Sequence, residues 1–141
     1  RIPQLQFTIV GINPSEKILA LQSKCVHVAG QVPDLRPYYQ QCTACIIPLR
    51  AGGGTRLKIL EAMAYGRPVI STTIGCEGLS VEDSKHILIA DDPSTFADKT
   101  VHLLSDADLQ QSLIHNAREL IERVYDWDVI AQQALQAYDK L

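Results

Sequence analysis

Residues 50–72, RAGGGTRLKILEAMAYGRPVIST, bring together residue types that can hold an anion. Gly52 to Gly54 precede a segment with helical spacing of apolar residues, and glycines let backbone N–H groups approach an anion without side-chain obstruction. The amino end of a helix adds roughly half a positive charge. Thr55 offers a hydroxyl, and Lys58 offers a cation one turn along the helix. This pattern is typical of a loop that binds a diphosphate.

Glu61 follows one further turn along the same side of the predicted helix, where its carboxylate can accept hydrogen bonds from paired sugar hydroxyls such as those of a ribose. The simpler alternative is a helix-entry turn in which Lys58 and Glu61 form an exposed ion pair, stabilising by about 0.2–0.5 kcal/mol. Spacing alone leaves both interpretations open. Two standard phosphate motifs are excluded, because the dinucleotide fingerprint needs a glycine at Leu57 and an acid at Thr72, and the P-loop pattern also fails.

Apolar runs and helix-start signals alternate along the chain. Asn13 is predicted to cap a first helix, with Pro14 at its first position and Glu16 completing a capping box. Strands are predicted at residues 6–11, 26–30, 44–49, 68–72 and 86–90, and further helices from Asp34, Thr55, Asp92, Asp106 and Asp126. This order predicts an α/β fold with a Rossmann-like parallel sheet and helices on both faces. The loop at residues 50–54 then lies at the carboxyl end of a strand, where such sheets bind ligands.

The composition suits one globular domain over residues 1–141, with 46% hydrophobic residues. A net charge of -3 without a basic stripe argues against a nucleic-acid partner. Because no apolar run approaches the ~20 residues of a membrane span, we expect no transmembrane segment and a soluble, cytoplasmic protein. Arg1 opens the chain and Met63 is its one methionine, which suggests a piece of a longer protein.

The cysteines and histidines show no metal-ligand spacing. Cys42 and Cys45 have the two-residue gap of redox and zinc motifs, but no second such pair exists. We therefore predict that the cysteines are buried free thiols, which fits a reducing compartment. His27 and His86 lie on or beside predicted strands, where a structural role is expected.

Residues 32–79, VPDLRPYYQQCTACIIPLRAGGGTRLKILEAMAYGRPVISTTIGCEGL, strongly resemble the carboxyl-terminal, donor-binding half of glycosyltransferases of the GT-B fold. The resemblance is closest to family 4 (group 1), which are retaining enzymes. The later segments HILIADDPSTFADKTVHLL and NARELIERVYDW are similar to the closing segments of that family. The resemblance thus covers nearly the whole chain, and its centre, GGGTRLKILEAMA, is specific.

The resemblance implies roles for particular residues. Lys58 would stabilise the charge of the leaving group as the catalytic residue, Glu61 would bind the ribose, and the turn at residues 30–32 would hold the base through backbone groups. Many members carry a glutamate for the donor sugar where Gly53 stands here. Glu77, after the fourth strand, is a further candidate, although a loop carboxylate is more often only solvated. The implied donor- or nucleotide-binding residues are Gly30, Gln31, Val32, Gly52, Gly53, Gly54, Thr55, Arg56, Lys58 and Glu61.

The resemblance further implies a transferase of the hexosyltransferase type that uses a nucleotide-diphosphate sugar, with no cofactor and no obligatory metal. The acceptor would be bound by an amino-terminal domain that this chain lacks, so the chain alone is expected to be inactive. A first strand with its helix would also be missing. We expect the edge between residues 6–10 and 44–48 to be filled from outside, for example by self-association through the open sheet, rather than closed by direct pairing.

Two other functions remain open at this point. A non-catalytic Rossmann-like module that binds a nucleotide or a protein is compatible with the glycine at position 53. A dinucleotide-dependent oxidoreductase is disfavoured by the missing fingerprint. The sequence does not determine the donor base, the sugar or the acceptor.

Overall fold

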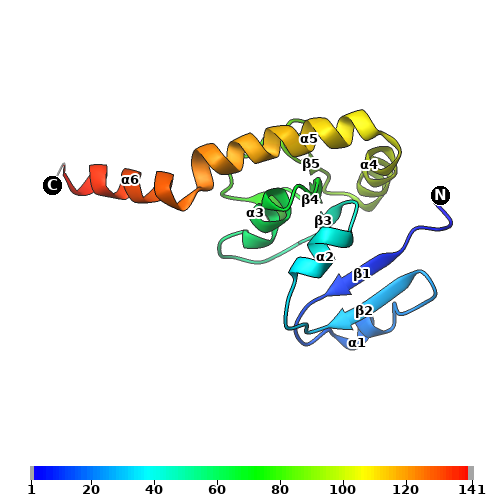
Figure 1. The fold of residues 1–141 in the computed structure, drawn as a ribbon. Helices are drawn as coiled ribbons and strands as arrows, with labels where there is room; N and C mark the ends of the chain where they lie inside the picture. Colours follow the sequence, from blue (N-terminus) through cyan, green and yellow to red (C-terminus); the bar gives the residue numbers. More distant parts are fainter. Residues whose placement is uncertain (1, 140–141) are drawn as a thin grey trace. The chain divides into compact units, whose positions relative to one another are not determined.

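The computed structural model describes residues 2–139 of the chain. It consists of two compact units, which meet in the sequence between Tyr38 and Tyr39. The first unit contains the parallel strands β1 (Phe7–Val10) and β2 (Val26–Gly30), which lie side by side, and the short helix α1 (Glu16–Leu19) (Figure 1). Their register is regular from Phe7 opposite Val26 to Ile9 opposite Val28, and it then shifts so that Val10 opposes Gly30.

The predicted capping box of the first helix is wrong. Asn13 has a φ of 50°, in the left-handed region, which asparagine tolerates better than most residues. The helix begins at Glu16 instead, after Ser15, and its amino end has no side-chain cap. The helix therefore begins two residues later than the predicted first position, Pro14.

The second unit continues from the last turns of the helix α2 and contains the other three strands (Figure 1). Strands β3, β4 and β5 form one parallel sheet in that order. The elements from α2 onward are α2 (Arg36–Gln41), β3 (Cys45–Ile47), α3 (Leu57–Ala64), β4 (Val69–Ser71), the 3₁₀ turn η1 (Ile74–Cys76), β5 (Leu88–Ile89), α4 (Pro93–Ser105), α5 (Ala107–Leu120), the π-helical turn η2 (Ile121–Tyr125) and α6 (Trp127–Tyr138).

Strand β4 shows why this sheet needs helices on both faces. Successive strand residues point to opposite faces, and Val69 and Ile70 are each 0% exposed. Val69 packs in one apolar cluster with Ile59, Ala62 and Met63 of α3, whereas Ile70 packs in another with Leu103 of α4 and Leu113 of α5. The predicted α/β, Rossmann-like architecture is confirmed for the second unit.

The three helix starts predicted at Asp92, Asp106 and Asp126 are confirmed, and the start predicted at Thr55 is corrected. The side chains of Asp92, Asp106 and Asp126 each accept a backbone N–H at the start of α4, α5 and α6. Helix α3 begins at Leu57 rather than at Thr55, because Arg56 has a non-helical ψ of 50°. Except for β2, which has the predicted bounds, the observed strands are also shorter than predicted, with β5 limited to two residues.

A sheet with helices on both faces, as predicted from the sequence, would bury its strands, and the strands of the first unit are less buried than that. Among the described residues, every fully buried apolar side chain lies at or after Ile59, and β1 and β2 are only partly covered. The described strands form two separate sheets, of two and of three strands. What completes the open sheet stays a prediction. No helix within residues 2–139 has the length and apolar character needed to cross a membrane.

Candidate nucleotide-binding site

The glycine-rich loop follows β3 and leads into α3. Gly52 and Gly54 have φ angles of 142° and 84°, which residues with a Cβ rarely adopt. Gly53 and Thr55 are exposed, so the loop surface is open to a ligand. The sequence prediction of a flexible, side-chain-free backbone at this strand end therefore fits the observed loop.

Arg56 holds the glycine-rich loop through hydrogen bonds to its carbonyl groups. It is 8% exposed, and its guanidinium donates from Nη1 to the Gly53 carbonyl at 3.2 Å and from Nη2 to the Gly52 carbonyl at 3.2 Å. Nη2 also pairs with Glu77 Oε2 at 3.4 Å. Arg56 was predicted to contact the donor directly. Its Nη atoms contact the loop backbone, its Nε has no hydrogen-bond partner within residues 2–139, and contact with the donor stays a prediction.

The arginine contacts determine where the loop N–H groups point. In a trans peptide the C=O and the following N–H point in opposite directions, and the described chain has no cis peptide bond. With the carbonyls of Gly52 and Gly53 turned to Arg56, the N–H groups of Gly53 and Gly54 point away from it. Neither N–H has a hydrogen-bond partner among residues 2–139.

The amino end of α3 adds further unpaired donors beside this loop. The first intrahelical bond starts at the Ile59 N–H, and no side chain caps the helix. The N–H groups of Leu57 and Lys58 therefore also lack partners within the described chain. Unpaired N–H groups at a helix start, together with the helix dipole, form an anion-binding arrangement.

Lys58 and Glu61 do not form the ion pair that the simpler interpretation requires. Both residues are exposed, and no contact within 4.0 Å joins them among the described ion pairs. The Lys58 ammonium thus has no ion-pair partner within residues 2–139. This observation favours the ligand-binding interpretation of the spacing.

Glu61 has a partner that the sequence did not reveal. The Tyr39 hydroxyl donates to Glu61 Oε2 at 3.1 Å, and the Tyr39 ring stacks on Tyr65 with a centroid distance of 5.2 Å. Burial, and then the neighbouring carboxylate, raise the pKa of Tyr39, so it stays a hydroxyl donor. The other oxygen, Oε1, has no hydrogen-bond partner within residues 2–139, which leaves it able to accept from a ligand hydroxyl.

The end of β4 packs tightly against the base of the loop. The Thr72 hydroxyl donates to the Leu49 carbonyl and accepts the Gly75 N–H at 3.0 Å. A Cβ on Gly75 would lie 2.2 Å from Ser71 Oγ and 2.9 Å from the Ile47 carbonyl oxygen, so only glycine fits there. The turn η1 thus carries Glu77 close to Arg56, and Glu77 contacts the arginine that orients the loop.

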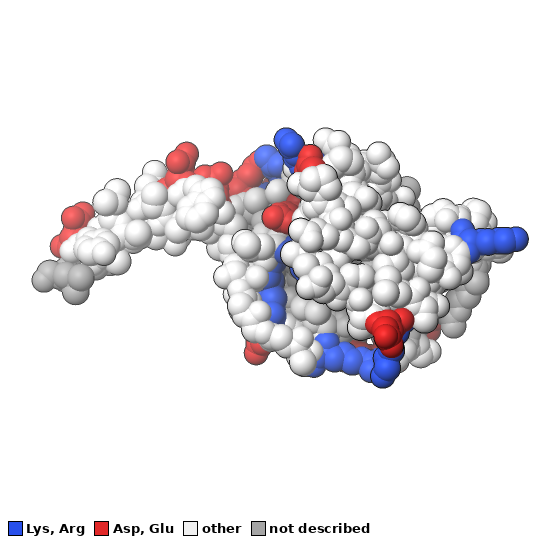
Figure 2. Space-filling view, turned by 90° about the horizontal axis from the view of Figure 1, so that it is seen from below, with Lys and Arg blue, Asp and Glu red and all other residues white. Residues whose placement is uncertain are grey.

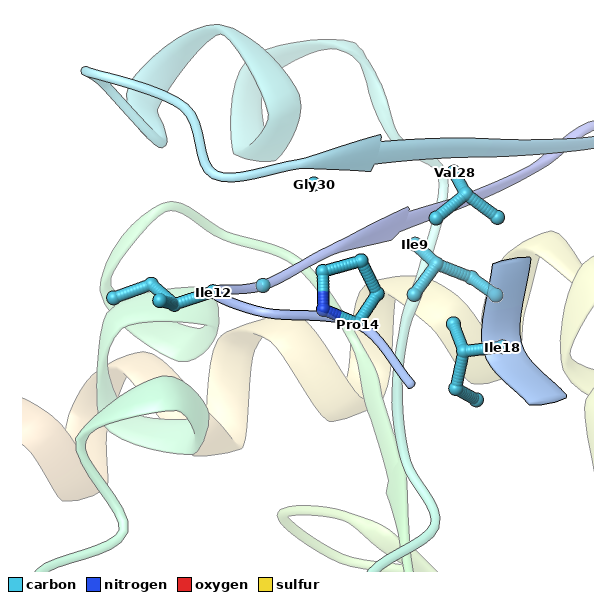
Figure 3. Close-up of a pocket in the computed structure, with 7 residues that line it drawn as sticks. Ile9, Ile12, Pro14, Ile18, Val28 and Gly30 are labelled. Carbon is cyan, nitrogen blue, oxygen red and sulfur yellow. The ribbon is translucent and has the colours of Figure 1, made fainter. Parts of the chain in front are cut away.

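The predicted base-binding turn belongs to the first unit. Gly30 has a φ of 68°, and its carbonyl accepts the Gly11 N–H at 2.9 Å. Gln31 is exposed and Val32 is half-buried. Figure 3 shows an apolar pocket at the carboxyl ends of β1 and β2, and it is lined by Ile9, Gly11, Ile12, Pro14, Ile18, Val28 and Gly30. Only Gly30 of the predicted turn lines it.

Neither a basic stripe on the face drawn in Figure 2 nor a cluster of metal-binding side chains is found within residues 2–139. Figure 2 shows small, separated basic and acidic groups on the face drawn, without a continuous basic stripe. Within residues 2–139, no three His, Cys, Asp or Glu side chains gather as a metal site. His86 is buried and accepts the Glu82 N–H at Nδ1, which is the structural role predicted for it.

Comparison with known proteins identifies the family. Residues 1–106 match the family model of the glycosyl transferases group 1, and the chain belongs to this family. It is 28% identical over 142 residues to the phosphatidyl-myo-inositol mannosyltransferase of Mycobacterium leprae (strain TN), covering 96% of this chain and 38% of that protein. It is 34% identical over 110 residues to the D-inositol 3-phosphate glycosyltransferase of Corynebacterium urealyticum (strain ATCC 43042 / DSM 7109), covering 77% of this chain and 26% of that protein.

Solved structures agree with this assignment. The sucrose-phosphate synthase of Thermosynechococcus elongatus superposes with a TM-score of 0.82 at 29% identity, over 99% of this chain and 39% of that chain. Anabaena Alr3699/HepE in complex with UDP superposes with a TM-score of 0.86, over 99% of this chain and 42% of that chain. At 21% identity the second likeness shows the fold alone. The carboxyl-terminal half of a GT-B glycosyltransferase, predicted from the sequence, is therefore confirmed as the fold.

Proposed function

We propose that this chain is the donor-binding part of a retaining glycosyltransferase that transfers a hexosyl group from a nucleotide-diphosphate sugar. The observation that carries the proposal is a set of N–H groups, those of Gly53, Gly54, Leu57 and Lys58, that have no hydrogen-bond partner within residues 2–139, together with the Lys58 ammonium, which has no ion-pair partner there. A diphosphate is the ligand that such a concentration of donors and positive charge suits. Family membership and the UDP and UDP-glucose complexes of the HepE structures support it.

Each residue then has a stated task. The loop N–H groups and Lys58 hold the diphosphate and stabilise the negative charge that develops on the leaving group. Glu61 accepts from the ribose hydroxyls through Oε1, while Tyr39 holds Oε2. This arrangement needs no metal ion to neutralise the leaving group, because N–H dipoles and an ammonium supply the positive potential.

Calorimetric titration with UDP, GDP and ADP tests the proposal. We expect weak binding of at least one nucleotide by this chain, so protein concentrations suited to millimolar affinities are required. Glu61→Gln should weaken binding by about 1–3 kcal/mol, because a charge-assisted hydrogen bond to the ribose is lost. Its melting temperature should stay close to that of the unmodified chain.

A matched control separates this effect from a general change of charge. Glu119 lies on α5 with a side chain 67% exposed and pairs with His115, so Glu119→Gln should leave nucleotide binding unchanged. Absence of heat with all three nucleotides would contradict the site. Unchanged binding by Glu61→Gln would contradict only the ribose assignment.

The second candidate function is a non-catalytic module that binds a nucleotide or a protein. It is favoured by one residue, Gly53, which stands where many members of the resembled family carry a carboxylate for the donor sugar. A transfer assay separates the two. We expect no turnover from these 141 residues alone, and turnover when the chain is joined to an acceptor-binding amino-terminal domain. Failure of the joined protein with every activated sugar would favour the module.

A further inference from the structure

Cys42 and Cys45 lie on either side of the turn between α2 and β3. The sequence predicted buried thiols, but both residues are only half-buried and both are free. Their sulfur atoms are 3.6 Å apart. A disulfide requires about 2.05 Å, so a shift of roughly 1.5 Å would join them.

The two thiols have different surroundings. Two effects lower the pKa of Cys42 to about 7, namely the hydrogen bond from the Cys45 thiol and the positive charge of Arg67. Burial opposes them. Arg67 is fixed beside it, because Nη1 donates to the Cys42 carbonyl at 3.0 Å. The pKa of Cys45 is raised by the same hydrogen bond and by burial. The attacking thiolate is therefore Cys42, and Cys45 is the resolving thiol.

We propose that Cys42 and Cys45 form a dithiol that reacts with a low-molecular-weight disulfide to give an intramolecular disulfide. In the first step the Cys42 thiolate attacks one sulfur of the small disulfide, and one small thiolate leaves. In the second step Cys45 loses its proton and attacks Cys42 Sγ, and the second small thiolate leaves. The protein loses two protons and two electrons, and with them one small disulfide becomes two small thiols.

The dithiol is connected to the candidate site through Tyr39. The Cys42 thiol donates to the Tyr39 carbonyl at 3.5 Å, and the Tyr39 hydroxyl donates to Glu61 Oε2 at 3.1 Å. The Cys42 thiol donates to the Tyr39 carbonyl only while it is protonated, whereas disulfide formation would remove this donor at every pH and draw Cys42 Sγ toward Cys45. Tyr39 then holds Glu61 less firmly. This consequence, weaker nucleotide binding by the oxidised chain, rests on the proposed function, whereas disulfide formation does not.

The first experiment identifies the disulfide without using nucleotide binding. The reduced chain is incubated with oxidised glutathione, quenched with acid, alkylated under denaturing conditions and mapped by mass spectrometry. We expect two of the four cysteines to resist alkylation, joined as a Cys42–Cys45 peptide. Cys25→Ser, which removes the exposed cysteine, should give the same product. Cys45→Ser should accumulate a glutathione adduct on Cys42, because the resolving thiol is missing.

The outcomes separate the parts of the proposal. Reaction confined to exposed Cys25, or no linked peptide in the unmodified chain, would overturn it. In a second experiment, UDP titration of the oxidised chain should show an affinity lower by roughly two- to tenfold than that of the reduced chain, the loss expected for one positioned hydrogen bond. Equal affinities would refute the connection through Tyr39. If neither form binds any nucleotide, the proposed function is contradicted. The presence or absence of the Cys42–Cys45 disulfide still tests the dithiol proposal by itself.

Discussion

Strands β3 and β4 are paired neighbours in one parallel sheet, yet the segments that follow them are built differently. Ser71 at the end of β4 and Thr72 and Gly75 after it are buried, and the Thr72 hydroxyl joins two backbone segments. After β3, Gly52, Gly53 and Gly54 are exposed, and none of their three N–H groups has a hydrogen-bond partner within the described chain. Arg56 connects the two regions, because it contacts the loop carbonyls and Glu77.

The difference shows how a fold can keep donors unpaired without losing the position of the loop. Backbone N–H groups are normally paired when buried, and unpaired ones are tolerated where solvent or a ligand reaches them. Here the loop is exposed on the side of its N–H groups and held on the side of its carbonyls. The closed end of β4 supports the loop, and the open end of β3 carries the N–H groups that are proposed to bind the nucleotide.

The largest expected effect comes from adding one methyl group at the closed end. Gly75→Ala should lower the free energy of unfolding by about 3 kcal/mol, because the new Cβ would overlap Ser71 Oγ and the Ile47 carbonyl. Gly53→Ala is the matched control at the open end, where nothing lies within 4 Å of an added Cβ, and it should change stability little. Urea unfolding followed by circular dichroism measures both. Equal stability of the two variants would break the comparison.

A smaller effect is expected from the threonine that joins the two segments. Thr72→Val leaves the Gly75 N–H without its acceptor and the Leu49 carbonyl without its donor, so stability should fall by about 1–2 kcal/mol. Thr55→Val removes an exposed hydroxyl from the loop and should be nearly neutral. Thermal melting of the pair tests this. A destabilised Thr55→Val with an unaffected Thr72→Val would reverse the assignment of support and binding regions.

Arg56 is expected to act on binding more than on the fold. A lysine cannot contact the carbonyls of Gly52 and Gly53 together with the fork geometry of arginine. Arg56→Lys should therefore lower nucleotide affinity by roughly tenfold, about 1.4 kcal/mol, by releasing the loop peptides. Glu77→Gln changes the ion-pair partner of Arg56. Because the Glu77 side chain is 72% exposed, this substitution should weaken nucleotide binding by well below about 1 kcal/mol. If Glu77→Gln weakened binding more than Arg56→Lys did, Glu77 would itself contact the ligand.

The smallest expected effect is a change in pH dependence. Burial, and then Lys85, lower the pKa of His86 below its usual 6.5, and Nδ1 must stay unprotonated to accept the Glu82 N–H. The unfolded chain takes up this proton first, so the contribution of neutral His86 is present above pH about 6.5 and is lost as the pH falls toward the folded pKa. His86→Gln should flatten the stability difference between pH about 7.5 and pH about 5.5. His102→Gln, with a side chain 66% exposed, should retain the slope of the unmodified chain.

Local signals in the sequence predicted most of the secondary structure. The strand at Val26–Gly30 has the predicted bounds, and the three aspartate caps are where the sequence places them, because a cap depends on residues two or three positions apart. Asn13 was wrongly predicted to cap the first helix, because asparagine is common both at helix caps and in the left-handed region. The burial of β1 and β2 was overestimated, since apolar composition does not say what covers a strand.

The sequence predicted the residue types of the candidate site but not the contacts between these residues. Spacing brought the glycines, Lys58 and Glu61 together, because they share one loop and one helix. The Arg56–Glu77 and Tyr39–Glu61 contacts join residues 21 and 22 positions apart, which leave no periodic trace in a single sequence. Arg56 was therefore assigned to the ligand, whereas its observed contacts are with the loop that would hold the ligand.

The central claim is that a diphosphate binds to unpaired N–H groups at the end of β3, and amide NMR tests it most directly. The chain labelled with ¹⁵N is titrated with UDP while the amide signals are followed. We predict that the signals of Gly53, Gly54, Leu57 and Lys58 shift together and saturate, while those of Gly75 and Cys76 at the closed end of β4 shift far less. Saturable shifts confined to other residues, with the four loop and helix amides unchanged, would contradict the account.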